Sequence, residues 1–247
     1  ISVFFCFFFF IFPSFRFFFS SNNCLNMDGN GEFDENDKHF MTTLSASMAS
    51  HIPEVFPEKI EISGEIHTRK HLAVSEMEIL QIERVLRVVD TGLGLFYARH
   101  KGPGWKSEKL DEMAEPGLVY IWYECGNDIS CFLSMMMVLE PAGKTLYLYE
   151  IHVLPQFQSR HLGSSLMSYF HKYARFISGL GQKARNSLEQ HFSCVATGLT
   201  VFSDNEKAFQ WYTKLGYEFA LDSPRDKRLR NGKTVKPLFY ILSRPLQ

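Results

Sequence analysis

The chain has 247 residues, a length that favours one medium-sized domain with extensions, or at most two small domains. It carries 26 basic and 27 acidic side chains, for a formal net charge of −1, so no overall field draws it to nucleic acid or to another charged surface. Its five cysteines are odd in number and scattered without a Cys-x-x-Cys pair, which indicates a reducing compartment and argues against structural zinc.

The first 50 residues do not have the pattern of a folded domain. Residues 1–19 are rich in phenylalanine, but they lack the basic start and small-residue end of a signal peptide, and polar residues interrupt the run that a membrane span needs. The chain starts with isoleucine, so we expect a fragment or translated upstream sequence, with Met27 as the candidate start and a hydrophobic anchor as the alternative. Residues 20–50 are polar and are predicted to be disordered.

Residues 26–37 have some features of an EF-hand calcium loop. With Gly31 at the sharp turn, Asp28, Asn30 and Glu32 fall at ligand positions. The first and last ligand positions do not carry the usual Asp and Glu, no periodic helix precedes the loop, and no second hand is present to pair with it. We therefore interpret this similarity as fortuitous.

The predicted domain begins near Pro57. Alternating residues predict an edge strand over 58–68, and apolar spacing predicts a helix from Ser75, where Glu78 completes a capping box. Further predicted elements, in order, are a helix at 107–113, strands at 118–125, 129–139 and 146–153, a helix from 164, a strand at 194–202, a helix at 205–215, and strands at 217–221 and 238–242. Short turns join the three central strands into an antiparallel meander, and a basic loop at 225–236 separates the last two strands.

The stretch from Leu146 to Leu166 carries the main functional signal. It opens as a strand, is broken at Pro155, crosses a polar loop that ends at Gly163, and continues as an amphipathic helix. A strand, a short loop and a helix in this order present unpaired backbone N–H groups at the start of the helix. The stretch therefore predicts a site for a phosphate or pyrophosphate.

This loop resembles motif A of the GNAT acetyltransferases, which cradles the pyrophosphate of coenzyme A: Gln158 matches its first position and Gly163 its last, after a strand that carries Glu150. His161 replaces the middle glycine; if that position has a positive φ the histidine is strained, and if it only supplies an N–H the side chain points outward. The resemblance implies acetyl-CoA as cosubstrate and no metal. It assigns cofactor binding to Ile151, His152, Val153, Gln158, Ser159, Arg160, His161, Leu162, Gly163 and Ser164.

A second segment resembles motif B of the same superfamily, with Asn205, Trp211-Tyr212 and Gly216-Tyr217 after a predicted strand. In the family this asparagine contacts coenzyme A; because Asn205 begins a predicted helix, N-capping explains it without any function, and one residue can do both. Tyr212 matches the tyrosine that protonates the departing thiolate in many GNAT enzymes. Packing in the core is the alternative for Tyr212.

Shorter motifs resemble one subfamily, the N-alpha-acetyltransferases of NatD type, which acetylate histone amino termini. They are Tyr147-Leu-Tyr-Glu150, Gly104-Trp-Lys106, Ser223-Pro224 and Ile241-Leu-Ser-Arg244, and the basic run at 227–233 is similar to fungal members. The resemblance covers about residue 72 to the end. It implies the α/β GNAT fold, a mixed central sheet flanked by helices, in a single domain over residues 57–247.

Amide formation from a thioester and an α-amine needs a neutral amine, a stabilised oxyanion and a proton for the thiolate. The family gives the glutamate at Glu150 a central catalytic role, so we expect it to act as the base, with holding a loop or a substrate group as the alternative. Tyr147 and Tyr149 alternate to the face opposite Glu150. A strand bulge is therefore needed to bring all three side chains to one site.

The resemblance also implies a set of residues that bind the acceptor peptide. The family places the Trp105 loop over the first substrate residues, and Glu140 is the acidic candidate for a substrate arginine, with a solvated turn residue as the alternative. Phe239 stands where the family has a tyrosine, and Tyr240 faces the other side of the strand. The full set is Tyr97, Trp105, Glu140, Tyr147, Tyr149, Thr200, Ser223 and Phe239.

The sequence thus predicts an enzyme that transfers acetyl from acetyl-CoA to the N-terminal α-amine of a protein, with histone tails beginning Ser-Gly-Arg-Gly as substrate. Two alternatives stay open: a GNAT enzyme that acts on lysine side chains or small amines, and a catalytically decayed module that binds coenzyme A or histone. We further expect a monomer of the nucleus and cytoplasm that binds neither membranes nor, directly, nucleic acid.

Overall fold

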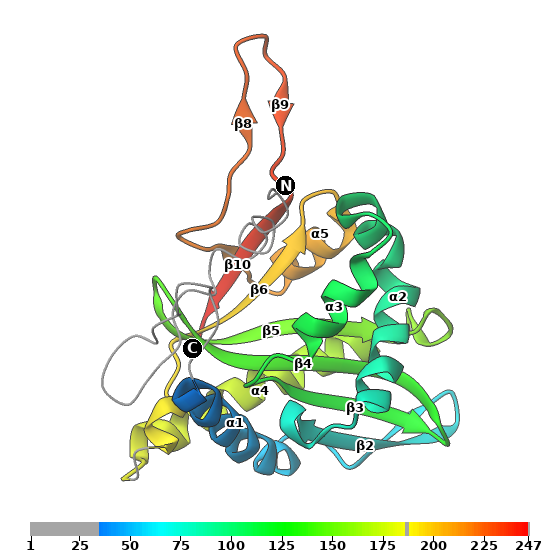
Figure 1. The fold of residues 1–247 in the computed structure, drawn as a ribbon, viewed down its shortest axis with the longest axis vertical. Coiled ribbons are helices and arrows are strands. Elements are labelled where there is room, and N and C mark those ends of the chain that lie inside the picture. The colour runs from blue at the N-terminus through cyan, green and yellow to red at the C-terminus, as the bar shows by residue number, and fades with distance from the viewer. Residues whose placement is uncertain (1–34, 186–187, 247) are drawn as a thin grey trace.

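The computed structural model describes residues 35–185 and 188–246, which fold around one eight-stranded sheet (Figure 1). The strand order is β1-β2-β3-β4-β5-β6-β10-β7, and every neighbouring pair is antiparallel except the parallel pair β5–β6. The strands are β1 Lys59–Ile62, β2 Glu65–Ala73, β3 Val119–Cys125, β4 Asp128–Glu140, β5 Gly143–Val153, β6 Ala196–Phe202, β7 Glu218–Phe219 and β10 Phe239–Pro245. A separate ribbon is made of β8 Lys227–Arg228 and β9 Thr234–Val235.

Helices cover both faces of the sheet, and a hydrophobic core fills the space on each side. On one face lie α2 (Ile79–Lys101) and α3 (Trp105–Met113); on the other lie α4 (Leu162–Lys183) and α5 (Glu206–Lys214). The expected mixed sheet flanked by helices is confirmed. Within residues 35–185 and 188–246, no helix has the length and apolarity that crossing a bilayer requires.

The expectation of disorder up to residue 50 is wrong for its last part, because α1 spans Glu35–Ser50. This helix packs on β2 and β3 and buries Met41, Leu44 and Met48, which recur at helical spacing among threonines and serines. Its last turn is also fixed to α4, where the Tyr173 hydroxyl donates a hydrogen bond to the carbonyl of Met48 at 2.6 Å. The folded domain therefore begins before Pro57.

Two other predictions at the N-terminus fall mostly outside the described residues. They are the phenylalanine-rich segment at 1–19 and the calcium-like loop at 26–37, of which only the last three residues are described, as the start of α1.

Helix α2 begins four residues later than its predicted start at Ser75. Glu78 is the residue before the helix, and its backbone N–H donates to the Gln81 side chain at 2.8 Å. The helix also continues through Gly92, although a glycine weakens a helix interior. A Cβ at Gly92 would lie 2.9 Å from the imidazole Nδ1 of His152, so the glycine leaves space for that ring.

One extra residue in β5 decides which side chains reach the same face. Ser134 pairs with Glu150 and its neighbour Met135 pairs with Leu148, so Tyr149 is left without a partner on β4. Such a bulge interrupts the alternation of a strand. Leu148 packs with the α4 core, whereas Tyr147 and Tyr149 pack with the α2 core, on the side where Glu150 meets α3. The bulge that the predicted site required is confirmed.

The burial of α1 makes a stability prediction. Met48 has no exposed surface, so we expect Met48→Ala to lower the free energy of unfolding by about 2–5 kcal/mol, the usual range for removing a buried methionine side chain. The matched control is Leu95→Ala, since Leu95 is 84% exposed and its loss should change stability by no more than about 0.5 kcal/mol. Urea unfolding of both variants measures this, and equal effects would show that α1 does not contribute to the core.

Candidate active site

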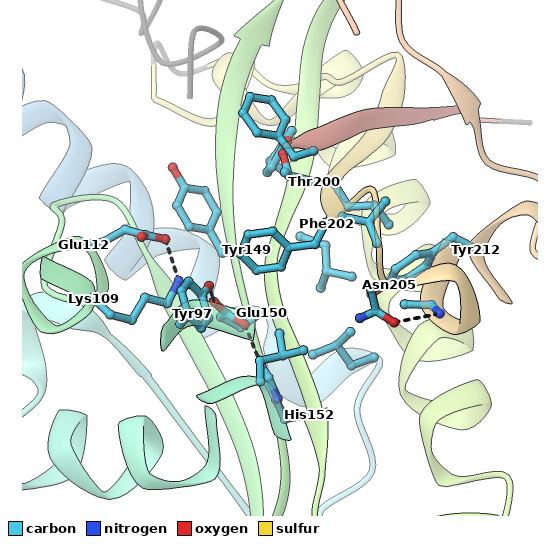
Figure 2. Close-up of a pocket in the computed structure, with 18 of the residues that line it drawn as sticks. Tyr97, Lys109, Glu112, Tyr149, Glu150, His152, Thr200, Phe202, Asn205 and Tyr212 are labelled. Atoms are coloured by element: carbon cyan, nitrogen blue, oxygen red, sulfur yellow. Dashed lines mark hydrogen bonds and ion pairs between the residues drawn. The ribbon is translucent and has the colours of Figure 1, made fainter. Parts of the chain in front are cut away.

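The candidate site is a pocket where β5 and β6 separate. The two strands pair only from Thr145 to Leu148, yet β5 runs on to Val153 and β6 to Phe202. The open wedge exposes unpaired edges of both strands and is closed at its sides by α2, α3 and α5 (Figure 2). Residues that line it include Tyr97, Lys109, Glu112, Tyr147, Tyr149, Glu150, Ile151, His152, Thr200, Phe202, Asn205, Ala208, Tyr212 and Phe239.

Glu150 lies at the centre of a buried polar network in this pocket (Figure 2). One carboxylate oxygen forms an ion pair with Lys109 of α3 and accepts a hydrogen bond from the Tyr97 hydroxyl at 3.3 Å. The other oxygen lies 2.6 Å from the imidazole Nε2 of His152. Lys109 in turn pairs with Glu112 at 2.6 Å, so a single buried ammonium is shared by two carboxylates.

The network holds its charges in the ionised state. Burial alone would raise the pKa of Glu150, but the Lys109 ammonium and the hydrogen bond with His152 outweigh it and lower that pKa to about 2. Burial would likewise lower the pKa of Lys109, but Glu112 and Glu150 raise it well above its ordinary value. Burial and the Glu150 charge raise the pKa of Tyr97, which therefore remains a donor. At neutral pH the pocket holds a permanent carboxylate.

Lys109 and Glu112 were not among the predicted site residues. They lie one turn apart on a short helix, a spacing that normally indicates a solvent-exposed ion pair. Only the tertiary contact of α3 with β5 turns this pair inward to Glu150. The one signal in the sequence was the position of the helix directly after Gly104-Trp105-Lys106.

His152 was predicted to bind the cofactor, but its side chain faces Glu150. The imidazole stacks on Phe132 with centroids 5.2 Å apart and fits against Gly92 of α2. These contacts fix the ring while Nε2 meets the carboxylate. His152 is thus placed to orient Glu150.

Trp105 is buried and does not line the pocket. It stacks on Tyr97 with centroids 4.8 Å apart and planes 11° from parallel, so it supports the ring that hydrogen-bonds Glu150. Phe202, which the sequence did not single out, contacts the same Tyr97 ring edge-on at 5.4 Å. The aromatic residues of α2, α3 and β6 therefore position one hydroxyl donor.

The predicted peptide side of the pocket is partly assembled. Tyr147 and Thr200 share a hydrogen bond between their hydroxyls at 2.5 Å across the β5–β6 wedge, and Tyr149 and Phe239 line the same opening. Ser223 does not line the pocket: its hydroxyl accepts the backbone N–H of Ile241 at 3.0 Å and so holds the chain against β10.

Phe239 reaches the pocket from β10, and its neighbour Tyr240 faces the opposite side, as predicted. There the Tyr240 hydroxyl donates to Asp226 at 2.5 Å and its ring packs on Phe209 and Phe219. The adjacent tyrosine therefore does not replace a hydroxyl at Phe239.

Glu140, at the end of β4, is a buried carboxylate whose Oε1 atom has no hydrogen-bond partner. Burial and the nearby Asp222 carboxylate raise its pKa to about 7, against a smaller lowering by Thr145. Glu140 does not line the pocket, but it is close enough to Tyr147 to help raise the pKa of that hydroxyl. A buried carboxylate in this state is stabilised by an incoming cation such as a guanidinium.

The predicted pyrophosphate loop joins β5 to α4 through a short 3₁₀ turn at Pro155–Phe157. Two of its residues, Ser159 and His161, have left-handed backbones with φ of 60° and 61°. The first alternative for His161 therefore holds: it is a non-glycine residue in a conformation that favours glycine. Gln158 closes the loop by donating its side-chain amide to the carbonyl of Val153 at 2.8 Å.

Gly163, by contrast, is the second residue of α4 and has an ordinary helical backbone. A Cβ there would meet the Trp211 ring at 3.5 Å, an ordinary contact, so a larger side chain would be crowded. The loop presents the first-turn N–H groups of α4, which have no partners within the helix. This chemistry fits a pyrophosphate.

Helix α5 supplies the far wall of the pocket. Asn205 caps it, because its side-chain oxygen accepts the N–H of Ala208 at 3.2 Å, and Asn205 also lines the pocket. Tyr212 lies about two helical turns later and also lines the pocket, where its ring forms a T-shaped pair with Tyr217 at a centroid distance of 5.9 Å. Burial raises the pKa of Tyr212, so the hydroxyl stays protonated, as a proton donor must.

One group of possible metal ligands occurs among the described residues. Glu65, His67 and Cys125 have ligand atoms within 4.8 Å of one another, at the far end of β2 and β3. None of the three lines the pocket.

No protein-family model matches the chain. Its sequence is 26% identical over 242 residues to N-alpha-acetyltransferase 40 of Saccharomyces cerevisiae, covering 87% of this chain and 79% of that protein.

Among solved structures, NAA60 of Arabidopsis thaliana in complex with a bisubstrate analogue is 15% identical, with a TM-score of 0.45. The match covers 72% of this chain and 98% of the NAA60 chain. PaiA N-acetyltransferase of Thermoplasma acidophilum in complex with coenzyme A is 10% identical, with a TM-score of 0.44. The match covers 72% of this chain and 99% of the PaiA chain. Within residues 35–185 and 188–246, the strand order, the one parallel pair β5–β6 and the α4 loop that follows β5 are those of the GNAT fold.

The loop geometry predicts opposite effects at two neighbouring positions. Gly163→Val should weaken acetyl-CoA binding at least tenfold, because its methyl groups crowd both Trp211 and an approaching phosphate, while Gly163→Ala is the matched control with a tolerated Cβ. His161→Gly should bind acetyl-CoA as well as the parent or better, because glycine adopts φ near 61° without strain. Calorimetric titration measures all three, and normal binding by Gly163→Val would remove the pyrophosphate assignment.

Proposed function

We propose that this chain is an acetyl-CoA-dependent N-alpha-acetyltransferase, which transfers acetyl to the N-terminal α-amine of a protein. The observation that carries the proposal is the ionised Glu150, held in the wedge between β5 and β6 beside a loop suited to pyrophosphate. Similarity to N-alpha-acetyltransferase 40 over most of both chains supports the same enzyme class.

The proposed substrate is a histone tail that begins Ser-Gly-Arg-Gly, and the proposed location of the enzyme is therefore the nucleus and cytoplasm. Glu140 and the adjacent Asp222 supply the acidic environment that an arginine side chain needs near the peptide side of the pocket. Tyr147, Tyr149 and Thr200 supply hydroxyl groups for the short residues before it.

Bound acetyl-CoA would supply an activated thioester, and this chain's residues would hold it. The first turn of α4 and the Gln158 loop are proposed to bind the pyrophosphate. The backbone N–H groups of Ile151 and Val153 are proposed to hold the thioester arm. The wedge beyond Leu148 then brings the thioester next to Glu150. Tyr212, across the wedge and protonated, is placed to give a proton to the leaving sulfur.

Glu150 is proposed to act on the amine through its charge as much as through its basicity. An α-amine has a pKa near 8, so about one in ten is already neutral at pH 7. A carboxylate with a pKa of about 2 is a weak proton acceptor but accepts a strong hydrogen bond from the N–H of that amine. It thereby orients the lone pair and stabilises the positive charge that develops on nitrogen. His152, bonded to Glu150, can then share the released proton.

Two other functions use the same pocket. A GNAT enzyme for lysine side chains or small amines would accept an N-blocked peptide with a free lysine. A catalytically decayed module, favoured by the strained His161 and the missing hydroxyl at Phe239, would bind coenzyme A or histone without turnover. An acetylation assay with a free Ser-Gly-Arg-Gly peptide, its N-blocked form and an N-blocked lysine peptide separates all three, and reaction of the free peptide alone supports the proposal.

Glu150→Gln should lower turnover of the free peptide by about 10²–10⁴-fold while acetyl-CoA affinity stays the same, because the amide keeps the shape but removes the charge. The residual rate should still rise with pH towards 8, as more substrate amine becomes neutral. Steady-state rates across pH and a binding isotherm measure this. Glu61→Gln, an exposed change on the edge strand β1, is the control, and normal turnover in Glu150→Gln would leave Glu150 a structural role only.

Glu140 predicts a dependence of peptide binding on pH. Its pKa of about 7 means that affinity for the arginine peptide should rise as pH increases through 7, because only the ionised carboxylate attracts the guanidinium. Glu140→Gln should weaken that binding by roughly 10–100-fold and abolish the pH dependence, in line with a hydrogen bond to a charged group. A peptide with methionine in place of arginine should bind both proteins equally; if Glu140→Gln weakens it too, Glu140 does not contact the arginine.

A further inference from the structure

The charges of this protein are unevenly distributed. Residues 225–236, here called the basic hairpin, hold six of the chain's 26 basic residues and one of its 27 acidic residues. That leaves 20 basic and 26 acidic residues elsewhere, so a strongly positive segment is attached to a negative remainder. The near-zero net charge, from which no nucleic-acid binding was expected, conceals this separation.

The basic hairpin has a defined shape and projects away from the domain beyond β10 (Figure 1). Its strands pair Lys227 with Val235 and Arg228 with Thr234, and the turn is closed by the N–H of Leu229 on the carbonyl of Lys233 at 2.8 Å. Gly232 supplies the positive φ of 82° that this turn requires. Every residue of the hairpin is exposed.

Only the base of the hairpin is tied to the domain. Arg225 lies over the Phe219 ring at 4.2 Å, Asp226 accepts the Tyr240 hydroxyl, and Lys236 pairs with Glu206 of α5 at 2.9 Å. The four cations farther out have no acidic partner within residues 35–185 and 188–246: Lys227, Arg228, Arg230 and Lys233. Four uncompensated charges on a short ribbon form a site for a polyanion.

We propose that the basic hairpin binds the phosphate backbone of double-helical DNA. The acceptor peptide is an unsuitable partner, because a tail with an N-terminal ammonium and an arginine would be repelled by the hairpin. Lys227 and Arg228 are consecutive in a strand and so point to opposite faces of the ribbon, which suits a ligand that offers phosphates on both sides. The major groove of B-DNA admits a two-stranded ribbon of this kind.

This interaction does not depend on which amine the enzyme acetylates. The hairpin follows Ser223, which is anchored to β10, and precedes Phe239 of the pocket wall. DNA bound there would lie beside the peptide side of the pocket. A basic protein tail that is already associated with this DNA would then lie close to Glu150.

The number of free cations sets the expected strength of the effect. Four phosphate contacts on duplex DNA give a slope of about −3.6 for the logarithm of the binding constant against the logarithm of salt concentration, equal to about a 100-fold loss of affinity between 50 and 200 mM salt. Fluorescence anisotropy of a labelled 20-base-pair duplex with the full chain measures both values. Replacing Lys227, Arg228, Arg230 and Lys233 by glutamine should remove most of the binding and flatten the slope.

The matched control removes four exposed lysines elsewhere: Lys59, Lys70, Lys172 and Lys183. It should keep the parent slope. A milder variant, Arg228→Gln with Arg230→Gln, should reduce the slope by about 1.8 and guards against misfolding of the fourfold change. All variants should acetylate a short free peptide at the parent rate, since no substituted residue lines the pocket.

Two results would overturn the proposal. One is equal DNA affinity and salt slope in the hairpin variant and the parent. The other is competition by poly-glutamate at the same charge concentration as effectively as by unlabelled duplex, which would make the hairpin a site for acidic proteins instead. Single-stranded RNA of the same length serves as a third competitor. Stronger competition by this RNA than by duplex DNA would also contradict the inference.

Discussion

The site depends on a single unpaired residue in the middle of the sheet. Tyr149 has no partner on β4, so the regular alternation of side chains along β5 is interrupted there. As a result, Tyr147, Tyr149 and Glu150 all point to the same face of the sheet. The parallel ladder to β6 ends one residue earlier, at Leu148, so the same place in β5 both re-aims the side chains and opens the wedge. A regular strand here would have continued the sheet and buried Glu150 on the wrong side.

The second constraint is electrostatic. Bringing Lys109, Glu112 and Glu150 out of water costs free energy that an apolar cluster of the same size would not, and an ion pair seldom recovers all of it. The arrangement therefore favours a charged pocket over maximal stability. Its rigidity comes from neutral contacts around the ions, with Trp105 behind Tyr97 and Phe132 behind His152.

Much of the fold could be predicted because its elements have strong local signals. The strands around Glu150 alternate, the loop at Gln158 breaks them, and Asn205 caps a helix as its position indicated. The network around Glu150 could not be predicted, since the inward turn of Lys109 arises only when α3 packs on the sheet. Likewise α1 has a weak apolar stripe, and only the complementary surface of β2, β3 and α4 reveals it as a core helix.

The position of α1 has a consequence for how the chain folds during synthesis. Met48 accepts a hydrogen bond from Tyr173, which lies 125 residues later in the chain. Helix α1 is therefore synthesised early, but its apolar stripe is fully covered only after the sheet and α4 have formed. Contacts of such sequence separation slow folding and leave apolar surface exposed meanwhile. A ribosome-bound chain that ends before α4 would lack the Tyr173 contact that fixes Met48, so part of the apolar stripe of α1 would stay exposed until the C-terminal half of the chain is made.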